Sequence, residues 1–179
     1  MSLSISAMGL KNVPVLTSDS TTALDQGVIH VPETSLPWSE TPERNVYLAG
    51  HRLGWPGTGS HLVLYRLNEL GGGERVTLWD TEGRRYDYRV IESFVVKAED
   101  SWVMGRVRMR DLLTLQTCTP IPTFHKRLIV CAKRILSDLL SADRAFPYKS
   151  ETTKWSKLGF SAVLGNGASE VPFERTTLT

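Results

Sequence analysis

The chain has 179 residues, of which 41% are hydrophobic and 22% charged, and its 21 Lys+Arg against 19 Asp+Glu give a formal charge of +2. This composition is typical of one folded domain and excludes a disordered chain or a collagen-like repeat. A near-neutral balance gives no reason to expect a nucleic-acid partner, because such proteins present a strongly basic face. A chain of this length buries about two thirds of its unfolded surface, which suffices for a core without disulfides.

Cysteine content and apolar stretches narrow the class further. Cys118 and Cys131 are too few for a disulfide scaffold, and neither lies in a CxxC pair, so any metal would need other ligands. We expect no metal and no cofactor. The longest apolar stretches, such as residues 62–65 and 128–132, are far shorter than the ~18 residues of a membrane span. Residues 1–10 lack the basic start and apolar segment of a signal peptide. These observations are compatible with a surface protein whose membrane anchor has been removed.

Both ends of the chain differ from its middle. Residues 1–25 are rich in Ser and Thr with little periodicity, which predicts a loosely attached leader segment. Residues 26–134 carry the regular patterns of one folded domain. Residues 135–179 begin with apolar positions at helical spacing and continue as a polar stretch rich in Ser, Thr and Gly, which predicts a C-terminal helix and tail.

Short strand-like runs follow one another through the middle of the chain. Alternating or β-branched residues predict strands at residues 27–31, 46–49, 75–79, 86–96, 112–117 and 127–132. Residues 80–83, Asp-Thr-Glu-Gly, predict a hairpin turn. Apolar residues at helical spacing from Leu62 to Leu70 predict one short helix that ends at the glycines 71–73. Many short strands with few helices predict a mainly β fold, either a closed barrel or a sandwich.

Cys118 has three interpretations. It ends the run 112–117 directly before Pro120 stops the strand, so a thiol there can stand at a rigid rim where a substrate reaches it. An ordinary cysteine is more often a small buried hydrophobe. A disulfide to Cys131 is the third option, because the two cysteines flank a predicted hairpin. Cys131 itself lies inside an apolar run, which favours a packed and unreactive thiol.

His51 and Arg127 also stand at predicted strand ends. His51 follows the run Val-Tyr-Leu-Ala-Gly, and Arg127 opens the strand after the Cys118 loop, where hairpin pairing can bring its guanidinium beside the thiol. Such a histidine is often only structural, and such an arginine is often only solvated. Together with Cys118, however, they form a coherent chemical set. The cysteine attacks a carbonyl, the histidine moves a proton to the leaving amine, and the arginine steadies negative charge.

These residues resemble the motifs of a known family. Residues 114–118, Thr-Leu-Gln-Thr-Cys, are similar to the TLxTC signature of sortases, the cysteine transpeptidases of Gram-positive cell surfaces. Residues 49–52, Ala-Gly-His-Arg, resemble the histidine motif of that family, and residues 127–130 resemble its arginine strand. The order of the three motifs agrees as well. The resemblance covers about residues 27–133 and implies a sortase β-barrel of about eight strands.

The resemblance also implies roles and a reaction. It makes Cys118 the nucleophile, His51 the general acid and base, Arg127 the stabiliser of substrate and oxyanion, and Thr117 a support for the oxyanion. The implied reaction of this peptidase-type enzyme is cleavage of an LPxTG- or LAxTG-type sorting signal between Thr and Gly. A Cys thioacyl intermediate is then transferred to an amine of a cell-wall precursor or a pilin lysine. The implied location is the extracellular face of the cell membrane.

The subclass and the fate of the acyl group are further expectations. Residues 49–52 and 64–67 are most similar to the actinobacterial class E sortases, although the segment 52–55 has no tyrosine after the histidine. The loops 97–111 and 119–126 are expected to build the groove in which an amine competes with water. Two alternatives use the same residues differently: a cysteine hydrolase that releases the peptide without transfer, and a non-catalytic barrel that binds it.

Overall fold

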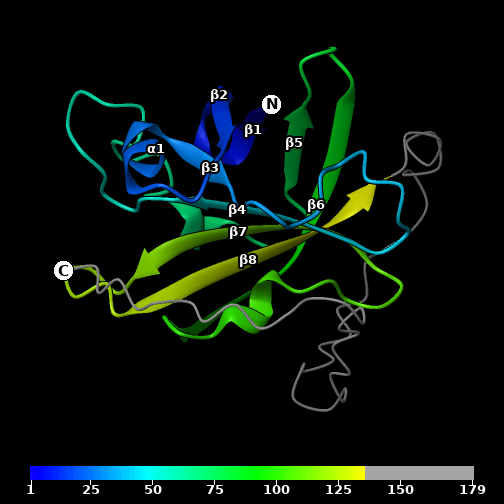
Figure 1. Cartoon of the computed structure of the whole chain (residues 1–179). Helices are drawn as coiled ribbons and strands as arrows, with labels where there is room; N and C mark the ends of the chain where they lie inside the picture. The colour runs from blue at the N-terminus through cyan, green and yellow to red at the C-terminus, as the bar shows by residue number, and fades with distance from the viewer. Residues whose placement is uncertain (136–179) are drawn as a thin grey trace.

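Eight strands close into a barrel within residues 1–135, the part of the chain that this computed structural model describes (Figure 1). The strands are β1 Ser2–Ile5, β2 Leu10–Thr17, β3 Val28–His30, β4 Arg44–Gly50, β5 Arg75–Trp79, β6 Arg85–Lys97, β7 Asp111–Thr119 and β8 Lys126–Ile135. Helical segments are short: α1 Thr21–Gln26, η1 Ser6–Met8, η2 Leu67–Glu69 and η3 Ser101–Met104. The predicted mainly β fold is confirmed, as a barrel and not a sandwich.

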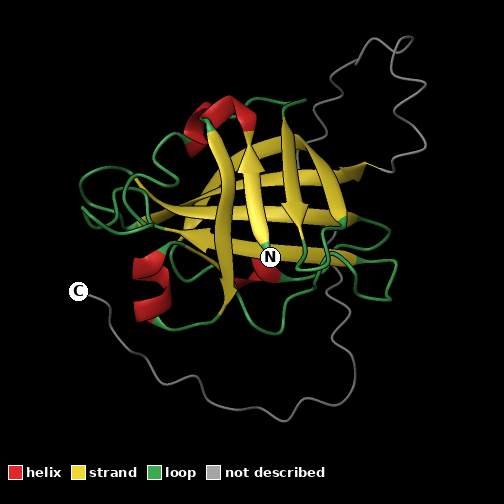
Figure 2. Ribbon diagram, turned by 90° about the horizontal axis from the view of Figure 1, so that it is seen from above, coloured by secondary structure: helices red, strands yellow, loops and turns green. Residues whose placement is uncertain are grey.

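The order of the strands around the barrel is β1-β2-β3-β4-β7-β8-β6-β5, and β5 pairs with β1 to close it. The pairs β2–β3 and β4–β7 are parallel, and the other pairs are antiparallel. Figure 2 shows this ring of strands from above, with the helices at its ends. Because β4 and β7 run in the same direction side by side, their carboxyl ends meet at one end of the barrel.

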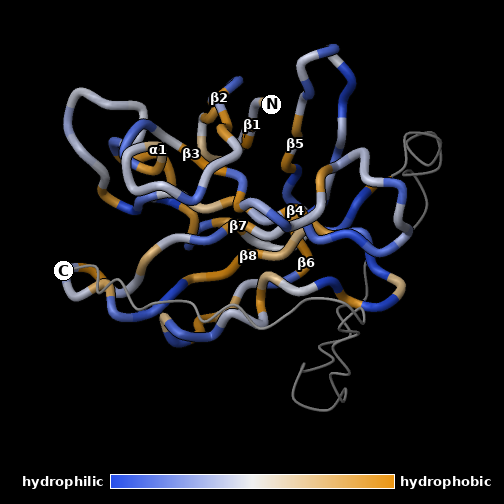
Figure 3. The backbone as a smooth tube through the Cα atoms, viewed as in Figure 1, coloured by the Kyte–Doolittle hydropathy of each residue, from blue (hydrophilic) through white to orange (hydrophobic). Residues whose placement is uncertain are grey.

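Alternate residues of the strands fill the inside of the barrel. Val46 and Leu48 of β4 and Leu113 and Leu115 of β7 are fully buried there, as the period of two along a strand requires. The intervening residues of β4, β7 and β8 are buried too, because the segment with η3 covers the outer face of these strands around Tyr47. Figure 3 shows the resulting contrast between hydrophobic strands and the hydrophilic turn between β5 and β6.

The predicted leader segment is part of the barrel. Residues 1–25 contain β1, β2 and α1, and β1 lies between β2 and β5, so the barrel does not close without it. Leu3 and Ile5 are completely buried in the main core, and Val15 of β2 is nearly so. Polar residues separate these few inward positions, and the sequence pattern therefore looked unstructured.

The predicted helix between Leu62 and Leu70 is wrong except for its last turn. The chain forms a series of turns there and then the 3-10 helix η2. Leu62 adopts a left-handed backbone conformation (φ 56°), which interrupts a helix, and its amide donates to the carbonyl of Leu53. The apolar side chains that suggested a helix, among them Leu64 and Leu67, are buried in the main core instead.

The hairpin turn at residues 80–83 is confirmed, with the amide of Asp80 donating to the carbonyl of Arg84 at 3.1 Å. The predicted C-terminal helix and tail lie outside the described residues, apart from Ile135 at the end of β8. No helix among residues 1–135 is long and apolar enough to cross a membrane.

Candidate active site

The register of three neighbouring strands brings His51, Cys118 and Arg127 to one end of the barrel. β4 runs parallel to β7 with Ala49 opposite Gln116, and His51 is the first residue after β4. β7 runs antiparallel to β8, and Cys118 lies directly opposite Arg127. Figure 1 shows the arrowhead of β7 at the end of the barrel that also holds α1. Residues distant in sequence thus meet at the rim that the strand ends form.

The two cysteines have different surroundings. Cys118 is partly exposed, whereas Cys131 is buried among the residues that η3 covers. Both thiols are free, and Cys131 lies opposite Thr114 in the ladder, so the disulfide option is wrong. Burial raises the pKa of the Cys131 thiol to about 12, and the nearby charge of Glu92 adds to the shift. The prediction of a packed, unreactive Cys131 agrees with this environment.

Thr117 connects the two strand ends that carry His51 and Cys118. Its hydroxyl donates to the backbone carbonyl of Gly50 at 2.8 Å, and only 1% of the residue is exposed. A threonine hydroxyl has a single hydrogen to donate, and here it is used inside the fold. In this structure the hydroxyl hydrogen of Thr117 is therefore engaged with Gly50 and is not offered to a substrate. Its hydroxyl positions the residue before His51 relative to the residue before Cys118.

Arg52 forms a second connection on the other side of His51. Its guanidinium donates from Nη1 to the hydroxyl of Thr119 at 3.2 Å and from Nη2 to the side-chain oxygen of Asn68 at 2.6 Å. Thr119 is the residue after Cys118. The pair His51 and Cys118 is therefore bracketed by two side-chain hydrogen bonds between β7 and the end of β4.

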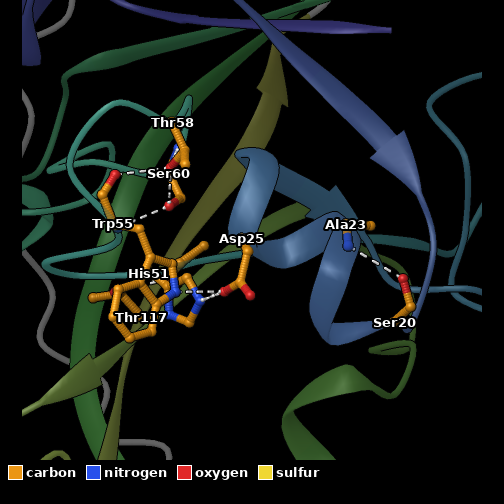
Figure 4. Close-up of polar contacts among 9 residues, drawn as sticks. Ser20, Ala23, Asp25, His51, Trp55, Thr58, Ser60 and Thr117 are labelled. Atoms are coloured by element: carbon orange, nitrogen blue, oxygen red, sulfur yellow. Dashed lines mark hydrogen bonds and ion pairs between the residues drawn. The ribbon is translucent and has the colours of Figure 1, made fainter.

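His51 has a partner that the sequence patterns did not indicate. Its Nε2 lies 2.9 Å from Oδ1 of Asp25, and the indole Nε1 of Trp55 donates to the same oxygen at 2.9 Å (Figure 4). The side chains of His51 and Asp25 are 30% and 40% exposed. These two hydrogen bonds hold the pKa of the Asp25 carboxyl below its usual value, and the bond with His51 has the larger effect. Asp25 lies on α1, in the segment predicted as a leader, and no spacing rule connects it with His51.

The guanidinium of Arg127 forms hydrogen bonds with the loop that joins β7 to β8. Nη1 donates to the backbone carbonyls of Phe124 at 3.1 Å and Lys126 at 3.2 Å. The residue is partly exposed, and among residues 1–135 its other guanidinium nitrogens form no hydrogen bond. Arg127 thus fixes the loop beside Cys118 and keeps donors that can meet a bound carbonyl or carboxylate.

The described residues do not offer a metal site. No group of three or more His, Cys, Asp or Glu side chains within residues 1–135 could hold a metal ion.

His30, another of the histidines, is buried, and it forms hydrogen bonds with Thr17, Thr34 and the carbonyl of Ser35. Burial of the His30 ring lowers the pKa of this histidine. His30 is therefore a structural residue of the barrel.

Comparisons with known proteins identify the family. Residues 3–135 match the family model of the sortase domain. Sortase C-1 from Actinomyces oris is 30% identical, with a TM-score of 0.65 over 75% of this chain and 72% of that protein. Sortase C1 from Streptococcus agalactiae is 28% identical, with a TM-score of 0.67 over 76% of this chain and 67% of that one. No curated protein sequence matches significantly. The chain belongs to the sortase family, whose members are cysteine transpeptidases.

A third solved structure extends the likeness beyond the class C enzymes. A lid mutant of sortase A from Corynebacterium diphtheriae is 25% identical, with a TM-score of 0.67 over 75% of this chain and 69% of that one. The structural likeness therefore includes sortases named C and A, and it does not single out one subclass.

Proposed function

We propose that this protein is a sortase that cleaves a sorting signal between Thr and Gly and transfers the acyl part to an amine. In this proposal Cys118 is the nucleophile, His51 the general acid and base, and Arg127 the group that stabilises the substrate carbonyl. The observation that carries the proposal is the register that sets Cys118 opposite Arg127, with His51 following the parallel neighbour of the same strand. Thr117 supports this arrangement through its hydrogen bond to Gly50.

The proposed reaction has two steps that share one proton carrier. The proton of the Cys118 thiol moves to the His51 ring while the sulfur adds to the carbonyl carbon of the substrate threonine. The tetrahedral intermediate collapses, the C–N bond to glycine breaks, and His51 gives the proton to the leaving nitrogen. An amine then attacks the thioester, loses a proton to His51, and releases the Cys118 sulfur, which is protonated again. Guanidinium donors of Arg127 suit the negative charge that forms on the carbonyl oxygen in both steps.

The substrate and subclass belong to the proposal as well. The histidine motif at residues 49–52 and the segment 64–67 favour a class E enzyme with a preference for LAxTG signals, whereas an LPxTG preference is the alternative. The proposed acceptor is an amine of a peptidoglycan precursor or a pilin lysine, and the proposed place of action is the extracellular face of the cell membrane. The partly exposed Cys118, at the rim and not in the core, is what an extended peptide substrate requires.

A peptide panel with and without an acceptor tests the proposal. The full chain is incubated with LPxTG and LAxTG peptides, each alone and with triglycine, and the products and any enzyme adduct are identified by mass spectrometry. We expect a thioacyl adduct on Cys118 and a transfer product that needs the amine. The variant Cys118→Ala should form neither, while Cys131→Ala should form both.

Two outcomes would change the conclusion. Cleavage at the same rate without any transfer product would identify a cysteine hydrolase. Binding of a peptide without an adduct, in a protein whose Cys118 does not react with a methanethiosulfonate, would identify a non-catalytic peptide-binding barrel.

A further inference from the structure

The carboxylate of Asp25 forms a hydrogen bond with one of the two ring nitrogens of His51. Its Oδ1 lies 2.9 Å from Nε2, and this is the only hydrogen bond of the ring among residues 1–135. Figure 4 shows the carboxylate reaching from α1 toward the imidazole. An ionised carboxylate accepts hydrogen bonds and cannot donate one, so Nε2 must carry the hydrogen. In the neutral ring, Nδ1 is then the nitrogen with the free lone pair.

The position of the Asp25 carboxylate is fixed from two sides. The indole Nε1 of Trp55 donates to the same Oδ1 at 2.9 Å, so this oxygen receives two hydrogens from the segment that follows β4. Trp55 is held in turn, because its amide donates to the hydroxyl of Ser60 at 3.1 Å and its carbonyl accepts from Thr58 at 2.9 Å. The Asp25 side chain is 40% exposed, yet two hydrogen-bond partners set its orientation. A freely solvated carboxylate has no such fixed orientation.

The backbone of α1 is also held against the segment that carries His51. Gly59 packs so closely on the end of α1 that a Cβ there would clash with the carbonyl oxygen of Gln26, the residue after Asp25. The other end of α1 is capped by Ser20, whose hydroxyl accepts from the amide of Ala23 at 3.2 Å. The contact between Asp25 and His51 therefore depends on close packing of two backbones, which gives the two side chains a defined separation.

We propose that Asp25 is a positioning residue that holds His51 with its Nε2 protonated and its Nδ1 free to exchange protons with Cys118 and the substrate. This inference rests on the proposed function of the site. In the reaction above, the proton of the Cys118 thiol goes to Nδ1, and Nδ1 later gives it to the leaving glycine nitrogen. While Nδ1 holds that proton the ring is a cation, and the Asp25 carboxylate at Nε2 stabilises it. Trp55 assists by keeping the carboxylate directed at the ring.

Two readouts test the inference, and one of them needs no peptide. The first is the rate at which iodoacetamide alkylates Cys118 in the full chain, which depends on transfer of the thiol proton. The second is kcat and KM for the signal peptide with triglycine. We expect Asp25→Ala to lower both the alkylation rate and kcat by about tenfold or more, with KM changed less than twofold, because losses of this size follow removal of a group that orients a histidine.

The other variants separate charge, geometry and fold. Asp25→Asn keeps an oxygen acceptor without the charge and should lose less than Asp25→Ala, and Asp25→Glu should restore part of the rate. Trp55→Phe keeps the ring without its N–H and should lower kcat in the same direction by a smaller factor. Asp19→Asn, an exposed carboxylate just before the cap of α1, is the matched control and should leave both rates unchanged.

The two proposals fail in different ways. If Asp25→Ala and Trp55→Phe react with iodoacetamide and turn over peptide like the unmodified protein, the inference is overturned and the proposed function stands. Faster alkylation in Asp25→Ala also overturns it, since the carboxylate would then hold His51 away from the thiol. If no peptide is turned over by any form but alkylation falls in Asp25→Ala, the proposed function fails while the role of Asp25 holds.

Discussion

The hydroxyl of Thr117 donates a hydrogen bond to the backbone carbonyl of Gly50 at 2.8 Å. Each of these residues precedes a candidate catalytic residue, Cys118 in one strand and His51 after the other. This buried hydrogen bond between parallel strands therefore helps to fix the two strand ends that carry the sulfur and the imidazole. In the Thr-Cys pair of the motif, the threonine thus fastens β7 to the end of β4 at the place where chemistry is proposed.

Replacing Thr117 by valine should lower both stability and activity. Thr117→Val keeps the shape of the side chain but removes the hydrogen bond to Gly50, which costs about 1 to 2 kcal/mol when the group is buried. We expect a lower Tm and a kcat reduced several-fold, while Thr117→Ser keeps most of both. Thr114→Val is the control, because its buried hydroxyl bonds to Asn45 on the outer face. It should lower Tm without lowering kcat, and an equal loss of kcat would contradict the special role of Thr117.

Much of the barrel could be predicted from the sequence because its central strands have regular patterns. β5 coincides with the predicted run 75–79, and β7 and β8 contain the runs predicted at 112–117 and 127–132. β1 was not predicted, since its inward residues Leu3 and Ile5 alternate with serines and the strand has only 4 residues. Such a strand is defined by its pairing with β2 and β5, which is a property of the whole barrel.

The candidate site could be predicted only where its residues stand in contiguous motifs. Cys118 and His51 each end a strand-like run, and their meeting follows from strand pairing. Asp25 lies 26 residues before His51, on a helix of 6 residues, and contacts it where the backbone at Gly59 packs closely against the end of that helix. A contact of that kind depends on tertiary packing, so neither composition nor spacing could indicate it.

Thiol reagents should distinguish the two cysteines in the folded protein. Because burial raises the pKa of Cys131 to about 12, only about one thiol in ten thousand is ionised at pH 8. A methanethiosulfonate should therefore label Cys118 alone, as seen by peptide mapping. Cys131→Ala should be labelled like the unmodified protein, and Cys118→Ala should stay unlabelled until denaturant is added. Rapid labelling of Cys131 without denaturant would contradict the packing around η3.

Removing Arg52 should affect the site more than the fold. Its guanidinium connects the residue after His51 to Thr119, the residue after Cys118, and the side chain is only partly buried. Arg52→Ala should reduce kcat several-fold while Tm falls by a few degrees at most. Arg66→Ala removes an exposed arginine that pairs with Glu69 in the same segment and should change neither quantity measurably. An unchanged kcat in Arg52→Ala would mean that Thr117 alone suffices to hold the two strand ends.

Glu92 should make the stability of the barrel depend on pH. It lies on β6 opposite Cys131, and burial raises its pKa to about 7, although the charge of Arg110 opposes the shift. A carboxyl whose pKa is raised by folding contributes its full stability below its unfolded pKa of 4.5, and that stability is lost as the pH rises through about 7. The glutamine in Glu92→Gln has no ionisable group. The difference between the Tm of this variant and the Tm of the unmodified protein should therefore shift in favour of the variant between pH 5 and pH 8. Glu99→Gln, at an exposed position of the following loop, should retain the pH dependence of the unmodified protein. A Tm difference for Glu92→Gln that is the same at both pH values would show that the Glu92 carboxylate is solvated and not buried.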